Sequence, residues 1–456
     1  MVMRRIWGWL GFAGLFILSV AAVWAQAPAP PAPAARPLTL EEAICTALAH
    51  NPTVRIAEQQ VRRAGGQLTE ARSGLLPRVS AAAVYTRTGP IPTISIPTST
   101  GTETIQVGVP EDTRTRLSLA LPLDISGQIT AAVGAASFNR LAQEFALAAT
   151  RQNVALQVQE SFLAVLRAQG LAAVAEEAVA AAREHLRVAQ VNFAAGTVAH
   201  FDVLRAETQL ADFQQQLVVA RNAVQLAKSS LNFAMGENVN QPLELLPPAP
   251  QAPVVLPPVE ESQQQAGLRR PELLQAHAAR RAAEKGVHIA RSGLLPTLAL
   301  QANQNFDENP SSFGGQKENW EVSAALTLPI FDGAQTKGRL RQARADAESA
   351  LQGEQLTRNQ VMLEVRQAHL NVQEAQERIR VAEVEVTQAR EALRLAQLRY
   401  QAGLSAAIEV TDTEVALAQS RNNQVNAFYD YLLAIARLQK AVGAPTEELT
   451  PAGCKS

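Results

Sequence analysis

Two long stretches of the chain place apolar and small residues at alternating spacings of four and three. One series runs Val361, Val365, Ala368, Val372, Ala375, Ile379, Ala382, Val386, Ala389, Leu393, Ala396 and Tyr400. The other lies 207 residues earlier and runs Val154, Val158, Ser161, Val165, Ala168, Ala172, Ala175, Val179, Ala182, Leu186, Ala189 and Phe193. A mean spacing of 3.5 predicts α-helices in a left-handed coiled coil. Each helical run covers roughly 70 residues, or about 100 Å at 1.5 Å per residue, which indicates a rod or the stave of a tube.

Before each long helical run the pattern changes to a period of two. Leu117, Leu119, Leu121 and Leu123, for example, alternate with smaller or polar residues. Alternation of this kind predicts strands with one apolar face. We expect strands at about 78–88, 113–123, 297–306 and 320–330, the first of which alternates less cleanly. Polar or Pro/Gly-rich loops separate them at 89–112 and 307–319, so each half has one hairpin and the chain has only four strands.

Two sequence repeats show that the chain is duplicated. The segment 193–211, FAAGTVAHFDVLRAETQLA, recurs at 400–418 as YQAGLSAAIEVTDTEVALA. The heptapeptide ARSGLLP occurs at both 71–77 and 290–296. A glycine after one helix and an acidic residue opening the next are typical of a tight helical hairpin. The helices that follow the two turns end at Gly236 and Gly443, again 207 residues apart.

The repeats define the predicted organisation. The first repeat covers 38–241 with a turn at 196–202, and the second covers 263–443 with a turn at 403–409. A Pro-rich linker at 242–262 joins them, and a short tail follows at 444–456. The first helix should begin with a capping box formed by Thr39 and Glu42, and Asn51-Pro52 should interrupt it.

Composition removes several functional classes. Lys and Arg number 41 against 42 Asp and Glu, which lacks the basic excess of a nucleic-acid-binding protein, and aromatic residues are only 5%. The six histidines are scattered, and the sequence has no HExxH, no CxxC and no phosphate-binding glycine loop. We therefore expect no enzyme, no cofactor and no metal site.

The N-terminus indicates export. Residues 1–27 resemble a signal peptide, with Arg4 and Arg5 before an apolar stretch; an uncleaved membrane anchor is the alternative. A Pro/Ala-rich lead follows at 28–37. Cys45 and Cys454 would be able to pair in an oxidising compartment, but two free thiols are the favoured interpretation.

Four strands are too few to close a membrane barrel, which needs about eight. Oligomerisation resolves this problem, because three copies give 12 strands and their long helices can continue the tube. The alternative is a small soluble sheet joined to a coiled-coil bundle, in which case the protein is a pore-less periplasmic scaffold or tether.

The chain resembles the TolC-like outer-membrane efflux protein family over nearly its whole length after the N-terminus. The resemblance rests on 38-LTLEEAICTALAHNP-52, both ARSGLLP stretches, the Leu-Pro pairs at 121–122 and 328–329, and both duplicated turns. It implies a mainly α fold with a small β part. Duplicated coiled-coil hairpins would form an α-barrel, and four strands per protomer would contribute to a trimeric 12-stranded outer-membrane β-barrel.

The resemblance also implies a function and partners. The protein would be a homotrimeric exit duct in the outer membrane, contacting outer-membrane lipid and extending into the periplasm. Its partners would be an inner-membrane transporter and a periplasmic adaptor, in a tripartite efflux pump or a type I secretion system. The duct itself would catalyse nothing.

The same resemblance places the periplasmic tips at the two turns. Gly196, Thr197 and Val198 in the first turn and Gly403, Leu404 and Ser405 in the second would dock the adaptor. The simpler interpretation is that the two glycines only end helices, and both roles are compatible. Asp202 and Glu409 are interpreted as helix-start residues favoured by the helix dipole rather than as substrate contacts.

Overall fold

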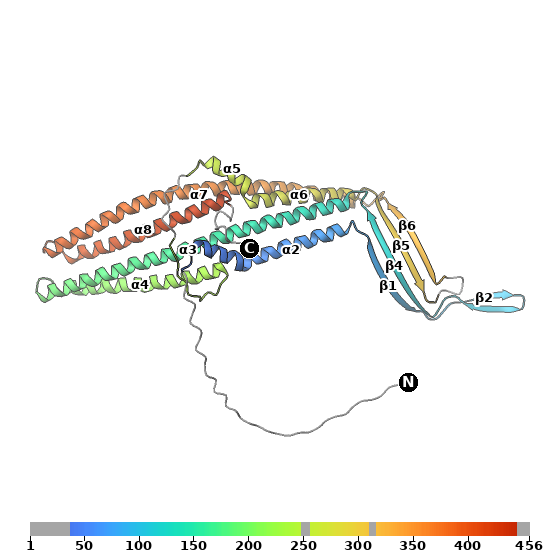
Figure 1. Ribbon diagram of the computed structural model, residues 1–456, viewed down its shortest axis with the longest axis horizontal. Helices are drawn as coiled ribbons and strands as arrows, with labels where there is room; N and C mark the ends of the chain where they lie inside the picture. The colour runs from blue at the N-terminus through green and yellow to red at the C-terminus, as the bar shows by residue number, and fades with distance from the viewer. Residues whose placement is uncertain (1–36, 248–255, 310–315, 445–456) are drawn as a thin grey trace, which may run out of the picture. The chain divides into compact units, whose positions relative to one another are not determined.

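A computed structural model describes residues 37–247, 256–309 and 316–444 (Figure 1). Its helices are α1 (Leu40–His50), α2 (Pro52–Ser73), α3 (Gln128–Ala194), α4 (His200–Met235), α5 (Val259–Arg269), α6 (Pro271–Ser292), α7 (Gln335–Gln401) and α8 (Ala407–Val442). Its strands are β1 (Arg78–Arg87), β2 (Thr93–Thr98), β3 (Gly101–Gln106), β4 (Glu111–Leu123), β5 (Thr297–Asp307) and β6 (Glu318–Thr327). The fold is therefore mainly helical with a small β part, as the sequence predicts.

The long coiled-coil helices are confirmed. α3 and α7 each contain 67 residues. The seam positions deduced from the 3.5-residue spacing are buried or half-buried, and Val158, Val165, Val365 and Val372 are 0% exposed. Phe193, at the tip, is the exception and is 43% exposed. The heptad pattern therefore identified which face of each long helix is covered.

The start and end signals of the helices are also confirmed. Thr39 and Glu42 form both bonds of the capping box at α1, and the Asn51 side chain accepts a bond from the Thr53 N–H at the start of α2. Gly236 and Gly443 end α4 and α8 with φ of +77° and +79°. A left-handed residue of this kind ends a helix, and glycine adopts it without steric cost.

The helices lie in two rows that share α3 and α7. Contacts run α4–α3–α8–α7 along one row and α2–α3–α6–α7 along the other. Figure 1 shows the order of the helices in both rows, with first-repeat helices at the lower edge and α7 at the upper edge. In each row, one edge is a first-repeat helix and the other edge is α7.

The principal sheet has the order β1–β4–β5–β6, with every neighbouring pair antiparallel (Figure 1). Its register aligns apolar side chains across the strands, for example Val79, Leu119, Ala302 and Val322 in one row. Neighbouring residues on the opposite face are polar, and Asn305 accepts a bond from Arg116 at 2.8 Å and donates one to Asn319 at 2.7 Å. The sheet therefore has one apolar and one polar face.

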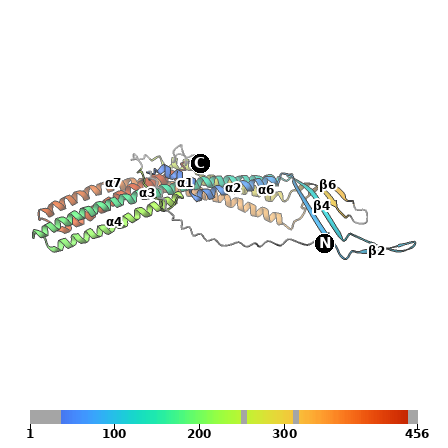
Figure 2. The same cartoon turned by 60° about the horizontal axis from the view of Figure 1, so that its bottom comes forward.

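The expectation of only four strands is wrong. β2 and β3 form an additional antiparallel hairpin inside the predicted loop at 89–112 (Figure 2). Polar residues and Ile94 and Ile96 alternate in β2, but the prolines in this segment gave it the composition of a loop. Pro97 is tolerated because both strands of a two-stranded ribbon are edge strands. The strand predicted at 320–330 is displaced to Glu318–Thr327, because the Pro329 region ends it.

Several predictions concern residues at the limits of the described chain. The signal peptide at 1–27 and nearly all of the lead at 28–37 lie outside it, as do tail residues 445–456. Helix α5 begins at Val259, within the range 242–262 predicted as linker. Cys45 is disulfide-bonded, so the favoured interpretation of free thiols is wrong for this residue, while Cys454 lies outside the described residues. No helix in the described ranges is long and apolar enough to span a membrane.

Candidate functional site: the hairpin tips and the contact between the hairpins

The turns at the two tips have the same backbone geometry. Gly196 and Gly403 have φ of +75° and +71°. Just after them, the Thr197 N–H donates to the Asn192 carbonyl at 3.0 Å, and the Leu404 N–H donates to the Arg399 carbonyl at 2.8 Å. These bonds satisfy the last free carbonyls of α3 and α7. A side chain at either glycine would meet no atom within 4 Å, so the backbone of both apices is open to solvent.

The predicted tip residues are not equally accessible. Gly196, Thr197, Gly403 and Leu404 are exposed, and the Leu404 side chain is the most prominent apolar group of the four. Val198 is half-buried because it packs against a cluster on the other hairpin that includes Tyr400 and Val410. Ser405 is also half-buried. The apices are therefore open, while Val198 and Ser405 belong partly to the packing beneath them.

Asp202 and Glu409 lie in the first turns of α4 and α8, where a negative charge is favoured by the helix dipole. Glu409 is also 3.4 Å from Arg399 across its own tip. Burial lowers the pKa of His185 on α3, and the nearby Asp202 carboxylate opposes this shift. Asp202 and Glu409 therefore lie at helix starts and also interact with a charged or titratable group, Asp202 with His185 and Glu409 with Arg399.

Ion pairs join the two hairpins, and the sequence did not reveal them. Glu160 and Glu177 on α3 pair with Arg437 and Arg421 on α8, the first pair at 2.9 Å. Asp430 on α8 lies 3.4 Å from Arg167 on α3 and 3.1 Å from Arg378 on α7. Each inter-hairpin partner is more than 240 residues away in the sequence. No local pattern identifies such pairs, because they depend on which helices become neighbours.

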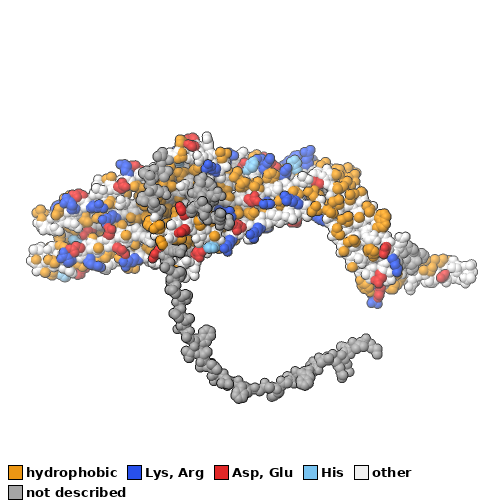
Figure 3. Space-filling model, viewed as in Figure 1, with side chains coloured by type: hydrophobic (Ala, Val, Ile, Leu, Met, Phe, Trp, Pro, Cys, Tyr) orange, Lys and Arg blue, Asp and Glu red, His pale blue; other side chains and the backbone are white. Residues whose placement is uncertain are grey.

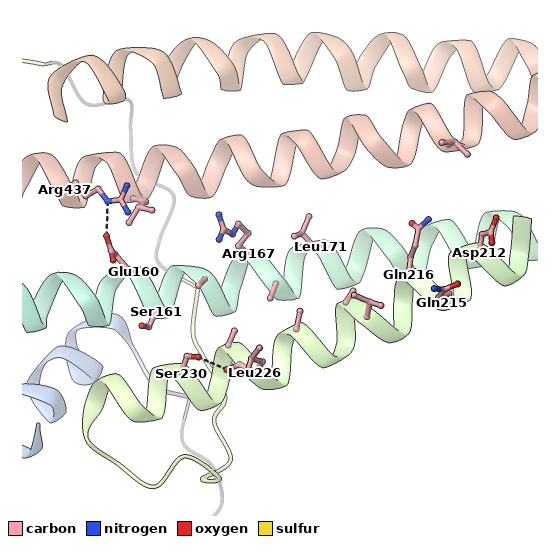
Figure 4. A pocket seen from close by; sticks show the side chains of 18 of the residues that line it. Glu160, Ser161, Arg167, Leu171, Asp212, Gln215, Gln216, Leu226, Ser230 and Arg437 are labelled. Carbon is pink, nitrogen blue, oxygen red and sulfur yellow. Dashed lines mark hydrogen bonds and ion pairs between the residues drawn. The ribbon is translucent and has the colours of Figure 1, made fainter. Parts of the chain in front are cut away.

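A groove of about 1190 Å³ lies between α3, α4 and α8. Figure 4 shows its polar and apolar side chains, with the Glu160–Arg437 ion pair crossing from α3 to α8. α3 contacts both α4 and α8, whereas α4 and α8 scarcely touch. The hairpins are therefore joined through α3 and α8, and α4 lies at the edge of the row.

One carboxyl group is buried in the contact between the hairpins. Glu414 on α8 is 5% exposed, and among the described residues its Oε2 has no hydrogen-bond partner. It borders a cavity of about 40 Å³ lined mainly by apolar groups such as Phe213 and Leu393, with Glu177 and Arg421 as the other charged residues. Burial raises the pKa of Glu414 to about 7.

Glu414 should make the contact between the hairpins sensitive to pH. Its pKa is higher in the folded state, so unfolded chains lose this proton first, and stability should fall as pH rises from about 4.5 to about 7. The difference between the two pKa values corresponds to about 3 kcal/mol of free energy of unfolding. We expect Glu414→Gln to abolish this part of the pH dependence and to be more stable than the parent above pH 7. Urea unfolding followed by circular dichroism at several pH values measures the free energy of unfolding of both proteins.

Glu207 provides the matched control. It occupies the equivalent position of the first repeat, 207 residues earlier, but is exposed. Glu207→Gln should leave the pH profile unchanged. Equal profiles for the parent and Glu414→Gln proteins would show that Glu414 is ionised without penalty in the folded state.

Most of the interactions at the tips and between the hairpins are packing contacts and ion pairs. Nowhere in the described ranges do three or more His, Cys, Asp or Glu side chains gather to hold a metal ion. Glu414 and His185, whose pKa values are shifted by burial, both lie among packed helices.

Comparison with known proteins identifies the family. The sequence model of the outer membrane efflux proteins matches residues 43–237 and 263–444. The chain is 24% identical over 306 residues to outer membrane protein TolC of Vibrio cholerae, covering 66% of this chain and 70% of that protein. It is 28% identical over 360 residues to cobalt-zinc-cadmium resistance protein CzcC of Cupriavidus metallidurans, covering 76% and 77%.

Solved structures show the same fold. The outer membrane protein VceC of Vibrio cholerae superposes with a TM-score of 0.77 at 22% identity, covering 90% of this chain and 97% of that one. CusC superposes with a TM-score of 0.79 at 19% identity, covering 89% and 92%. The two matched segments of the family model coincide with the two structural repeats. The chain belongs to the outer membrane efflux protein family, whose members are channels of the outer membrane and not enzymes.

Proposed function

We propose that the protein is a homotrimeric exit duct that passes substrate from an inner-membrane transporter and a periplasmic adaptor to the exterior. The observation that supports this most directly is the pattern of open edges. The sheet ends in β1 on one side and β6 on the other, and the helix rows end in α2 or α4 on one side and α7 on the other. Each layer thus has a first-repeat edge and a second-repeat edge.

Such edges suit head-to-tail assembly, which closes into a ring when the rotation permits it. In the sheet, β1 and β6 run in opposite directions, so β6 of one copy and β1 of the next would pair antiparallel. Three copies of a four-stranded sheet would give a 12-stranded barrel, within the range found in membranes. The apolar face would contact outer-membrane lipid, and the polar face carrying Arg116, Asn305 and Asn319 would line the pore.

The exposed apolar residues of the edge helices support the same assembly. On α7, Leu356, Leu363, Leu370, Val384 and Leu398 share one heptad position, which Glu377 and Glu391 also occupy, and the five apolar residues are 46–58% exposed. On α4, Val219, Leu226 and Phe233 recur every seven residues and are 64–69% exposed, and the first two also border the groove between α3, α4 and α8. A second apolar heptad line on each edge helix is the pattern expected where another helix packs.

Electrical measurement tests the duct directly. Protein added from detergent to a planar lipid bilayer should produce discrete conductance steps. A protein that stays soluble without detergent and gives no conductance would support the pore-less scaffold instead.

We further propose that the tips dock the adaptor through Gly403, Leu404 and their first-repeat counterparts Gly196 and Thr197. Leu404 is 73% exposed at its apex, and burying a carboxylate there against a partner would be costly. Leu404→Asp should weaken binding of a cognate adaptor at least tenfold, measured by surface plasmon resonance with immobilised trimer, while conductance is retained. Leu268→Asp is the control, because Leu268 is 79% exposed on α5, away from the tips. Equal losses in the two variants would contradict docking at the tips.

A further inference from the structure

A basic pocket lies where the helices meet the strands. It has a volume of about 470 Å³ and lies between the start of α3 and the end of α6. Lys285, His288 and Arg291 line it from α6, and Ser126, Gly127 and Thr130 line it from the other side. The ammonium of Lys285, the guanidinium of Arg291 and the hydroxyl of Ser126 are groups that suit a phosphate.

The two cationic side chains of the pocket, Lys285 and Arg291, have no ion-pair partner within 4.0 Å among the described residues. The nearest helix-start acid, Asp124, is already held by the Ile129 N–H at 2.9 Å, and by the N–H and hydroxyl of Thr130 at 2.7 and 2.6 Å. Burial would raise the pKa of Asp124, but these bonds outweigh it and lower the pKa. The carboxylate is therefore committed to the start of α3, and it forms no ion pair with Lys285 or Arg291.

Packing between α6 and α3 holds the basic face in place. The stem of Lys285 lies over Gly134 of α3, where an added Cβ would be 3.4 Å from the Lys285 Cδ and Cε. One helical turn earlier, the Arg281 guanidinium lies 5.8 Å from the centre of the Phe138 ring. The aliphatic stem of Lys285 is thus half-buried against α3, and this packing restricts the position of its ammonium group in the pocket.

We use the name apolar collar for three exposed residues near this end of the helices, Leu295, Ile330 and Phe331. Leu295 lines the pocket itself and is 43% exposed. At the neighbouring junction between β6 and α7, Ile330 and Phe331 are 94% and 89% exposed, and Gly293 packs against Thr336 of α7 at that junction. On the face seen in Figure 3, hydrophobic side chains cover the strands and the junction, and Lys, Arg and His side chains lie over the adjacent helices. A ligand that combines a phosphate with hydrocarbon chains would match both parts.

The first repeat lacks this pocket chemistry. By the alignment of the two ARSGLLP segments, Lys285, His288 and Arg291 correspond to Gly66, Thr69 and Arg72. The equivalent helix α2 forms and packs on α3 without the lysine and histidine. The basic cluster is therefore not needed to build the junction, which favours a binding role.

We propose that the pocket of Lys285, His288 and Arg291 binds the phosphate of an anionic phospholipid headgroup at the periplasmic surface of the outer membrane. The inference rests on the proposed function, because it requires the strands to lie in the membrane. The acyl chains would lie along the apolar collar, and the bound lipid would fix the height of the junction relative to the bilayer.

The test uses delipidated full-length protein in detergent, titrated with a short-chain phosphatidylglycerol and followed by native mass spectrometry. The parent protein should bind the lipid saturably. The double substitution Lys285→Gln with Arg291→Gln should weaken binding about tenfold or more. The control is Arg62→Gln with Arg72→Gln, which removes the same charge from α2 and should change the affinity less than twofold.

Two results would overturn the proposal. Equal losses in both double variants would indicate diffuse electrostatic attraction without a pocket. Inorganic phosphate that competes as well as the lipid would indicate a site for soluble anions. Bilayer conductance of the parent protein, measured separately, reports on the proposed channel, so failure of the duct and failure of the lipid site are distinguishable.

Discussion

Replacing Arg270 by alanine should lower the free energy of unfolding by about 2 kcal/mol. The Arg270 side chain is 3% exposed and joins three elements. It pairs with Glu272 at 2.9 Å and Glu364 at 2.7 Å, and donates to the carbonyl of Ala441 at the end of α8 at 3.2 Å. Removing it leaves the Ala441 carbonyl and Glu272 without this partner, while Glu364 keeps Lys440 at 2.9 Å. The loss of these bonds adds to the loss of packing.

Arg269→Ala is the matched control, because Arg269 is the adjacent residue and is exposed. It should change the free energy of unfolding by less than about 0.5 kcal/mol. Urea unfolding of the detergent-solubilised proteins, followed by circular dichroism, makes the comparison. Similar small effects in both variants would show that the Arg270 network contributes little to the fold.

Substituting Leu363 by aspartate should prevent assembly and thereby abolish conductance. Leu363 belongs to the exposed apolar line on α7, which we propose packs against the first-repeat edge of the next copy. A ring would bury the new carboxylate once per interface, at a cost of several kcal/mol each time. Trimers should be replaced by monomers in mass photometry of the detergent-solubilised protein, and bilayers should show no conductance steps.

The control for Leu363→Asp is Gln355→Asp, which adds the same charge to the same exposed helix but away from the apolar line. It should leave both assembly and conductance intact. Normal trimers in Leu363→Asp would show that this face of α7 is not an interface.

The duplicated architecture was predictable because its signals are local. Heptad spacing, the capping box at Thr39, the Asn51-Pro52 break and the terminal glycines each act within a few residues, and the structure confirms all of them. Even the hydrogen bonds at the junctions are duplicated. Asn51 donates to the Ala234 carbonyl at 2.8 Å, and Arg270 donates to Ala441, 207 residues after Ala234. The repeat therefore preserves the contact while changing the side chain that makes it.

The features that the sequence missed depend on tertiary neighbours. Glu207 and Glu414 occupy equivalent positions in the duplicated turn, yet one is exposed and the other buried, because α8 packs on α3 of the other hairpin whereas α4 lies at the row's edge. The ion pairs of Glu160 and Glu177 arise from the same asymmetry. The β2–β3 hairpin was not predicted for a different reason, because prolines gave its segment the composition of a loop.

Electron microscopy of the detergent-extracted protein tests the central proposal most directly. The open edges of the sheet and of both helix rows predict hollow particles with three-fold symmetry, longer than the ~100 Å of one long helix. Single-copy particles without a central channel, obtained in the absence of detergent, would contradict the duct and leave a periplasmic coiled-coil scaffold.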